Sequence, residues 1–418
     1  MNEKKTPTAL KKYFLLVVVL SGISGSIISV LQSGIMIQKN KNILKIYDSN
    51  ISIFLDRVDN RIYFDTITEI DNGILIGAVG EEFETPSSQA GIYKSLDEGR
   101  TWTLIKRFKN STYTPKNARC IYVSQNGTIF VGGSQVIYVS TDQGNTWYNA
   151  SSETFPPSQA NLWRIAETSN HTFFAGFHGR KAWIWRSDDY GHSWRNVTTE
   201  FGWVDDNIHD IKINMKNNWI YVTIGGNRRI DGTLNGRGLW RSKDFGKTWT
   251  QLIRAVDKEE TIRLAIVLNE TKTYLNTSEV GVFIGTEKAS GADIYYFLDR
   301  GEDERLYRKD LIKVLDLDDS WHGVILWALN ISDVFYFGVG CTGSSSGSLK
   351  GGIYAIVNGK TVTEIDSLSN VVQRKSYYFA SSGWSLNKIY ISHREGSMII
   401  QSEKSHAIEK ITHIPLMD

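Results

Sequence analysis

The sequence SLDEGRTW, residues 95–102, is the first of four near copies of one eight-residue pattern. The other copies are STDQGNTW at 140–147, SDDYGHSW at 187–194 and SKDFGKTW at 242–249. An Asp side chain accepts hydrogen bonds from backbone N–H groups of its own turn, and Gly adopts a positive φ without steric cost. The pattern therefore predicts four tight turns, each followed by a strand that begins with a Trp ring buried between neighbouring sheets. The turn-forming aspartates are Asp97, Asp142, Asp189 and Asp244.

Short apolar or alternating runs surround each turn and form a four-strand unit. Around the first copy these runs are RIYFDTIT, GILIGAV, GIYKS and TWTLIKRF. The unit recurs around the other three copies, and three weaker units cover about 262–313, 323–365 and 377–414. In the first of these, LDRGED around Asp299 is interpreted as a decayed turn. Units at this spacing predict an all-β, seven-bladed β-propeller, with six blades as the alternative if one weak unit is miscounted. Residues 50–56, NISIFLD, are left over and are expected to pair with the last unit.

On these turns the chain resembles the Asp-box, or bacterial neuraminidase repeat, proteins. That family includes sialidases and many non-enzymatic β-propellers, and the resemblance covers nearly all of the chain after residue 45. It implies that each turn joins the third and fourth strands of a blade. It also implies that the turns lie on the face away from the active site.

The N-terminal segment differs in composition from the rest of the chain. Residues 13–38 carry no charged side chain, and Lys4, Lys5, Lys11 and Lys12 precede them. About 20 apolar residues span a bilayer, and preceding lysines favour a cytoplasmic N-terminus. We therefore expect residues 1–40 to be a cytoplasmic tip with a transmembrane helix, and residues 41–418 to be an external propeller. The alternative is a cleaved signal peptide and a secreted protein.

Several bulk features bear on partners and cofactors. Nine Asn-x-Ser/Thr sequons are more than chance supplies and suggest an exported, glycosylated surface. A net charge of +2 argues against nucleic acid as a partner. The eight histidines lack metal-ligand spacing, so no metal and no cofactor is expected. Cys120 and Cys341 are expected to be free buried thiols, with one disulfide as the alternative.

Arginines precede the expected innermost strands of four units, where blades converge on the mouth of a central channel. They are Arg61, Arg119, Arg164 and Arg263. Guanidinium groups match carboxylates, sulfates and phosphates, so the pattern predicts an anion site. Loops on the same face add His178, Trp203, Asp205 and Arg228 as candidate ligand-binding residues. The structural alternative is that these arginines cap strand ends or pair with loop acids. A glycan, an anionic ligand or a surface protein is the expected partner.

Sialidases resemble this chain beyond the turns, which raises an enzymatic alternative. The resemblance implies a sialidase-like exo-glycosidase with Tyr378 as nucleophile and Glu82 in the acid position. Three departures from the family pattern weaken this reading. The family's acid is an Asp, and Glu82 stands in its loop instead. Tyr63 replaces the Pro of the first arginine motif, and no Glu is placed to activate the tyrosine. A tyrosine without a base is a weak nucleophile at neutral pH. Binding is therefore the preferred function.

Overall fold

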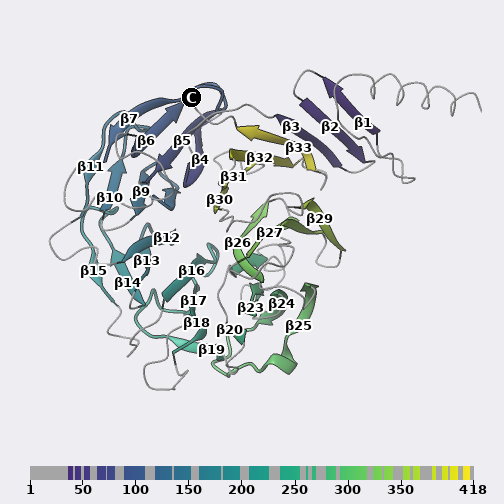
Figure 1. Cartoon of the computed structure of the whole chain (residues 1–418). Coiled ribbons are helices and arrows are strands. Elements are labelled where there is room, and N and C mark those ends of the chain that lie inside the picture. Colours follow the sequence, from purple (N-terminus) through teal and green to yellow (C-terminus); the bar gives the residue numbers. More distant parts are fainter. Residues whose placement is uncertain are drawn as a thin grey trace, which may run out of the picture.

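The structure is a computed structural model in which the strands form seven sheets. It describes residues 36–40, 43–48, 51–56, 64–71, 73–80, 89–108, 118–133, 136–151, 160–179, 182–197, 207–225, 236–254, 260–261, 266–269, 279–288, 292–317, 323–331, 334–341, 352–357, 361–367, 379–382, 388–393, 396–402 and 408–414. Figure 1 shows the sheets arranged around a central axis, so the fold is a β-propeller.

The first four sheets follow the four turn copies, and each consists of four antiparallel strands in chain order. The first sheet is β4 (Thr66–Asp71), β5 (Ile74–Val79), β6 (Gly91–Ser95) and β7 (Thr103–Arg107). The second is β8 (Cys120–Val123), β9 (Ile129–Gly133), β10 (Val136–Ser140) and β11 (Tyr148–Asn149). The third is β12 (Asn161–Glu167), β13 (Phe173–His178), β14 (Trp183–Ser187) and β15 (Arg195–Asn196). The fourth is β16 (Asn207–Ile213), β17 (Ile220–Gly225), β18 (Gly238–Ser242) and β19 (Thr250–Arg254).

The later sheets follow the weaker sequence units. The fifth contains β21 (Ile266–Asn269), β22 (Val280–Gly285), β24 (Ala292–Asp299) and β25 (Ile312–Leu317), with the short helix η3 (Arg308–Asp310) before β25. The sixth contains β26 (Gly323–Ile331), β27 (Val334–Cys341), β28 (Gly352–Val357) and β29 (Thr361–Ser367), extended by β23 (Glu287–Lys288) and β20 (Glu260–Thr261). The seventh contains β30 (Phe379–Ser382), β31 (Lys388–His393), β32 (Gly396–Ser402) and β33 (Ile408–Ile414).

The first strand of each sheet faces the axis. Each of β4, β8, β12, β16, β21, β26 and β30 contacts the first strand of the next sheet, and β30 contacts β4. Apolar residues between adjacent sheets form the cores: Phe130 and Phe173 join the second and third sheets, and Phe174 and Val222 join the third and fourth. The inner strands therefore form a closed ring around a channel.

Glycines on the second strands allow adjacent sheets to approach closely. A Cβ on Gly132 would lie 2.1 Å from Leu162 Cδ2, and one on Gly176 would lie 2.6 Å from Ile208 Cγ2. Both contacts reach the inner strand of the following sheet. Any larger residue at these positions would push two sheets apart.

The four repeat turns, residues 95–102, 140–147, 187–194 and 242–249, share one hydrogen-bond pattern. In the first, Thr101 donates its N–H to Asp97 Oδ1 (2.8 Å) and its hydroxyl to Asp97 Oδ2 (2.7 Å). Gly99, at φ 87°, donates its N–H to Ser95 Oγ (2.8 Å), and Trp102 Nε1 donates to the Gly99 carbonyl (3.0 Å). Each turn joins the third and fourth strands of its sheet, so all four lie on one face of the propeller, the repeat-turn face. The closing Trp rings pack into the apolar cores, as the sequence predicts.

The turn around Asp299 makes contacts with the neighbouring sheet that distinguish it from the four repeat turns. Gly301, at φ 80°, donates its N–H to Asp299 Oδ1 (2.9 Å), which retains part of the turn pattern. The same carboxylate binds Tyr221 Oη (2.8 Å) and the buried guanidinium of Arg241, both from the fourth sheet. The decayed turn therefore ties the fourth and fifth sheets together.

Three N-terminal strands extend the seventh sheet beyond β33. They are β1 (Met36–Asn40), β2 (Ile43–Asp48) and β3 (Ile51–Asp56), and β3 pairs with β33 in parallel (Figure 1). The expected pairing of residues 50–56 with the last unit is confirmed, at its outer edge.

Residues 1–35 of the expected anchor lie outside the described residues, and the end of the uncharged run, Met36–Gln38, belongs to β1. Within the described ranges, no helix has the length and apolar character needed to cross a membrane.

Candidate functional site

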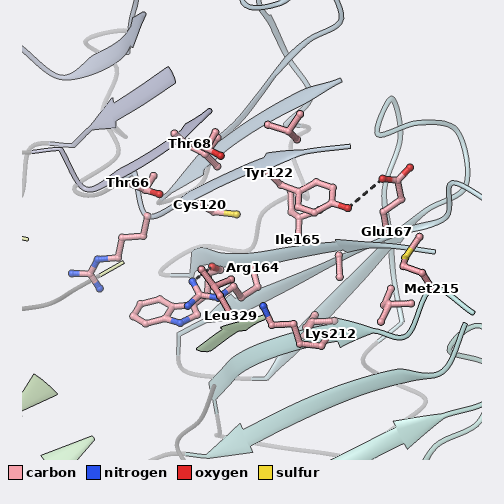
Figure 2. Close-up of a pocket in the computed structure, with 17 residues that line it drawn as sticks. Thr66, Thr68, Cys120, Tyr122, Arg164, Ile165, Glu167, Lys212, Met215 and Leu329 are labelled. Carbon is pink, nitrogen blue, oxygen red and sulfur yellow. Dashed lines mark hydrogen bonds between the residues drawn. The ribbon is translucent and has the colours of Figure 1, made fainter. Parts of the chain in front are cut away.

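A cavity of about 240 Å³ lies in the central channel, and we call it the channel cavity. Residues from the inner strands β4, β8, β12, β16 and β26 line it (Figure 2). Five of these side chains are charged or carry a phenol: Arg119, Tyr122, Arg164, Glu167 and Lys212. They come from three consecutive sheets, so the packing of adjacent inner strands brings them together.

Arg164 and Asp210 form an ion pair between the third and fourth sheets. Arg164 Nε lies 3.3 Å from Asp210 Oδ1, and Arg164 Nη1 donates to the Trp163 carbonyl at 2.9 Å. The Asp210 side chain is 1% exposed and the Arg164 side chain is 15% exposed. A carboxylate so deeply buried needs a cation close by. Arg164 therefore has a structural function as well as a position in the cavity wall.

A stack of cationic and aromatic groups lies beside this pair. Arg119 Cζ lies 5.3 Å from the Trp163 ring centroid, and the Trp163 ring stacks on His178 at 4.6 Å. His178 meets His209 edge to face at 5.5 Å, and His209 Nε2 lies 3.0 Å from the Gly225 carbonyl. These residues come from the beginnings of inner strands and the end of β13. They therefore mark the face opposite the repeat turns.

Lys212 projects from β16 into the channel cavity (Figure 2). Burial inside the channel lowers the pKa of its amine, and the positive charge of Arg164 lowers it further, while Asp210 opposes both effects. The cavity thus gathers an amine and two guanidinium groups, those of Arg119 and Arg164. Such a group of cations suits an anionic ligand.

A carboxylate is buried at the repeat-turn end of the cavity. Glu167 Oε2 accepts the Gln125 N–H at 2.8 Å and the Tyr122 hydroxyl at 3.2 Å, and Glu167 Oε1 lies 2.6 Å from His171 Nδ1. Burial raises the pKa of Tyr122 well above its usual value, and the Glu167 charge adds to this effect. Tyr122 is therefore a neutral hydrogen-bond donor at physiological pH, which makes it unsuited to act as a nucleophile.

Cys120 is a free, buried thiol in the cavity wall. Burial raises its pKa to about 12, against a smaller opposing effect from Arg164. The thiol is thus un-ionised at neutral pH and packs as a small apolar side chain. The expectation of a free thiol is confirmed for Cys120, and the Cys341 side chain lies outside the described residues.

The structure describes three of the candidate site residues from the sequence. Arg119 and Arg164 line one cavity, and His178 stacks behind it on Trp163. The remaining candidates lie outside the described residues: Arg61, Glu82, Trp203, Asp205, Arg228, Arg263 and Tyr378. Sequence reasoning missed Trp163, Lys212, Tyr122 and Glu167 as cavity residues. Consecutive residues of β8 and β12 line the cavity, so no alternation in the sequence distinguishes these four, and only their place on inner strands indicates them.

The expected equivalence of Arg119 and Arg164 is wrong by one residue. Cys120 pairs with Gly132 in the second sheet, and Arg164 pairs with the corresponding Gly176 in the third. A bulge between Leu162 and Arg164 inserts Trp163, so Arg119 corresponds to Trp163. A bulge redirects side chains locally, and both arginines still reach the channel cavity.

Among the residues that the structure describes, no three His, Cys, Asp or Glu side chains gather as metal ligands. The chemistry that these residues offer is therefore charge and stacking. Arg119, Arg164 and Lys212 supply positive charge, and the buried Trp163 ring packs against Arg119 and His178.

Comparisons with known proteins give a propeller fold. A family model described as "Sortilin, neurotensin receptor 3," matches residues 135–280, and no curated protein matches the chain. An ancestral GH74 enzyme superposes with a TM-score of 0.54 at 12% identity, over 85% of this chain and 47% of the enzyme. YCF48 bound to D1 peptide superposes with a TM-score of 0.53 at 12% identity, over 90% of this chain and 100% of YCF48.

A third similar structure is the extracellular domain of a one component system from B. thetaiotaomicron. Its TM-score is 0.52 at 13% identity, over 81% of this chain and 38% of that chain. This chain thus spans about half the length of the GH74 enzyme and less of the sensor domain. At these identities the likeness concerns the fold alone.

Proposed function

We propose that this chain is an exported, membrane-anchored, seven-bladed propeller of the Asp-box type, and that it binds an anionic ligand of the glycan class. The observation that carries the ligand proposal is the cluster of Arg119, Trp163 and Arg164 at one channel cavity. Guanidinium groups bind the carboxylate or sulfate of an acidic sugar. The buried Trp163 ring packs against Arg119 and helps to hold that guanidinium at the cavity.

The type and location of the propeller have separate support. Four repeat turns with one hydrogen-bond pattern favour the Asp-box type, and the closed ring of inner strands favours seven blades. The uncharged run at residues 13–38 and nine sequons favour an anchored, exported chain. The similar structures include a glycan-cleaving enzyme class, a peptide-bound protein and an extracellular sensor domain, and all these uses are compatible with ligand binding by a propeller.

The test is a glycan-array screen of the full chain in nanodiscs, followed by titration of any bound acidic glycan. We expect acidic glycans to bind and their neutral counterparts to bind at least 10-fold more weakly. Trp163→Ala and Arg119→Met should each weaken binding about 10-fold, since a stacking or charge contact contributes on the order of 1 kcal/mol. Arg100→Met, on the repeat-turn face, should leave binding unchanged.

Equal binding by all three variants would contradict the channel site. The same preparation should be incubated with a fluorogenic sialoside. Turnover that Tyr378→Phe abolishes would replace binding with a sialidase-like exo-glycosidase activity as the function. Glu82→Gln would then test the second predicted catalytic residue.

A further inference from the structure

The N-terminal strands determine which face of the propeller lies nearest to the predicted anchor. Ile51, the first residue of β3, pairs with Ile408, the first residue of β33. β33 is the fourth strand of its sheet, and fourth strands begin on the repeat-turn face and run away from it. Because β3 is parallel to β33, β3 also begins at the repeat-turn face.

The pairing of β1 with β2, and of β2 with β3, shows at which end of the sheet β1 begins. Tyr47 in β2 pairs with Ser52, near the beginning of β3, and Met36 in β1 pairs with Tyr47. Met36 therefore lies at the same end of the sheet as Ile51. By this register β1 begins on the repeat-turn side. Figure 1 shows β1 at the outer edge of the seventh sheet.

Little chain separates this entry point from the predicted membrane span. The uncharged run begins at Tyr13, and about 20 apolar residues from there cross the hydrocarbon core. Only about three residues then remain before Met36, and they extend roughly 10 Å at most. A tether of this length holds the repeat-turn end of the seventh sheet close to the bilayer surface.

An exposed apolar side chain lies on the same face. Leu96, in the first repeat turn, is 73% exposed although it is a large hydrophobic residue. Its sheet is the neighbour of the seventh, because β30 and β31 contact β4. Tyr190, in the third repeat turn, is 48% exposed on the same face. Leucine and tyrosine are favourable at a membrane interface.

We propose that the repeat-turn face of this propeller is apposed to the lipid bilayer in which the chain is anchored, with Leu96 at the contact. The mouth of the channel near Arg119 and Trp163 then points away from the membrane, toward soluble or opposing-surface ligands. This orientation rests on the membrane anchor in the proposed function.

Two matched pairs of labelling positions test the orientation in the full chain. Arg100 and Arg107 bracket β7, and both are exposed. Lys247, which is exposed, precedes β19, and Arg254, which is half-buried, is its last residue. Each strand has five residues, so the two members of a pair lie about 15 Å apart along the strand direction. In a background of Cys120→Ala and Cys341→Ala, each position is changed to Cys and labelled with a donor fluorophore.

Energy transfer to acceptor lipids is then measured in vesicles that hold the full chain. We expect Arg100→Cys and Lys247→Cys labels to transfer at least twofold more than Arg107→Cys and Arg254→Cys labels. Equal transfer within both pairs, or the reverse order, would overturn the orientation. Flotation of the same vesicles tests the anchor separately: a chain that stays at the bottom of the gradient overturns the anchor and the orientation together. A chain that floats with the reverse order overturns the orientation alone.

Discussion

Arg164 of the third sheet and Asp210 of the fourth form an ion pair across a sheet boundary, with 3.3 Å between Nε and Oδ1. Asp210 also accepts the N–H of Ile211 at 3.0 Å, so its carboxylate is held by its own backbone and by a neighbouring sheet. Because Asp210 is 1% exposed, the pair links the position of a cavity arginine to the packing of two sheets.

Removing the Arg164 guanidinium alone should lower the free energy of unfolding far more than removing both charges of the Arg164–Asp210 pair. Arg164→Met removes the guanidinium that lies 3.3 Å from the buried Asp210 carboxylate, and we expect a loss of about 3 kcal/mol in the free energy of unfolding. The double variant Arg164→Met/Asp210→Asn should recover more than half of that loss, because the buried carboxylate is neutralised together with the loss of its guanidinium. Urea denaturation of the full chain in detergent measures both. A loss below about 1 kcal/mol in Arg164→Met would show that water reaches Asp210 freely.

The aspartates of the repeat turns should make the stability of the folded protein decrease at acidic pH. Hydrogen bonds from the hydroxyl and N–H of Thr146 lower the pKa of Asp142 to about 2 in the folded protein. The unfolded value is about 3.9, so the folded state prefers the ionised carboxylate. A depressed folded pKa gives a stabilisation that is present above about pH 4 and disappears as the pH falls toward 2.

Thermal melting between pH 6 and pH 2 should show this dependence. Asp142→Asn should lower the melting temperature at pH 6 and reduce the decrease in melting temperature between pH 4 and pH 2. Gln143→Asn, at an exposed neighbouring position with φ 58°, serves as a control that adds no titrating group and keeps the Asp142 hydrogen bonds. An unchanged pH profile in Asp142→Asn would contradict an effect of the turn carboxylate.

Two glycines with nearly equal φ allow the effect of backbone strain on stability to be distinguished from the effect of side-chain packing. Gly127 has φ 82° and a Cβ there would meet nothing within 4 Å, whereas Gly191 has φ 84° and a Cβ there would lie 2.3 Å from Phe130 Cε1. Gly127→Ala should cost about 1–2 kcal/mol for the left-handed backbone alone. Gly191→Ala should cost about 1–3 kcal/mol more, because it overpacks the boundary between two sheets. Chemical denaturation compares the two, and equal losses would mean that Phe130 moves aside without cost.

The sequence predicted much of the fold because the turn chemistry is local. Asp97 and Gly99 specify a turn through bonds within eight residues, and the same letters recur in three further sheets. Units without complete turns were still found, since their strands keep their apolar runs. The free strand at residues 50–56 was assigned to the last sheet because it belonged to no other unit.

The cavity was predicted less well because it depends on register and on contacts between sheets. Arg164 corresponds to Cys120 and not to Arg119, because Arg164 pairs with Gly176 as Cys120 pairs with Gly132, and this register is not evident from the strand NLWRIAE alone. The stack of Trp163 on His178 follows from the pairing of β12 with β13, which local pattern does not specify. Likewise, the last residues of the uncharged run enter β1 because a partner strand, β2, is available.

The reactivity of Cys120 provides a test of how closed the channel is. Burial raises the pKa of this thiol to about 12, so at pH 8 the thiolate is a very small fraction of the folded population. A free, unperturbed thiol has a pKa near 8.5 and reacts readily at that pH. We therefore expect alkylation by iodoacetamide at pH 8 to be at least 100-fold slower in the folded chain than in urea.

The measurement uses the Cys341→Ser variant, so that mass spectrometry reports Cys120 alone. Arg164→Met serves as a companion variant: it removes the positive charge that lowers the Cys120 pKa, so the thiol should react still more slowly if the channel stays closed. Faster alkylation in Arg164→Met would instead mean that the ion pair with Asp210 keeps the inner strands together. Rapid alkylation of the unaltered channel would show that the inner strands open to admit reagent, and would contradict a buried thiol.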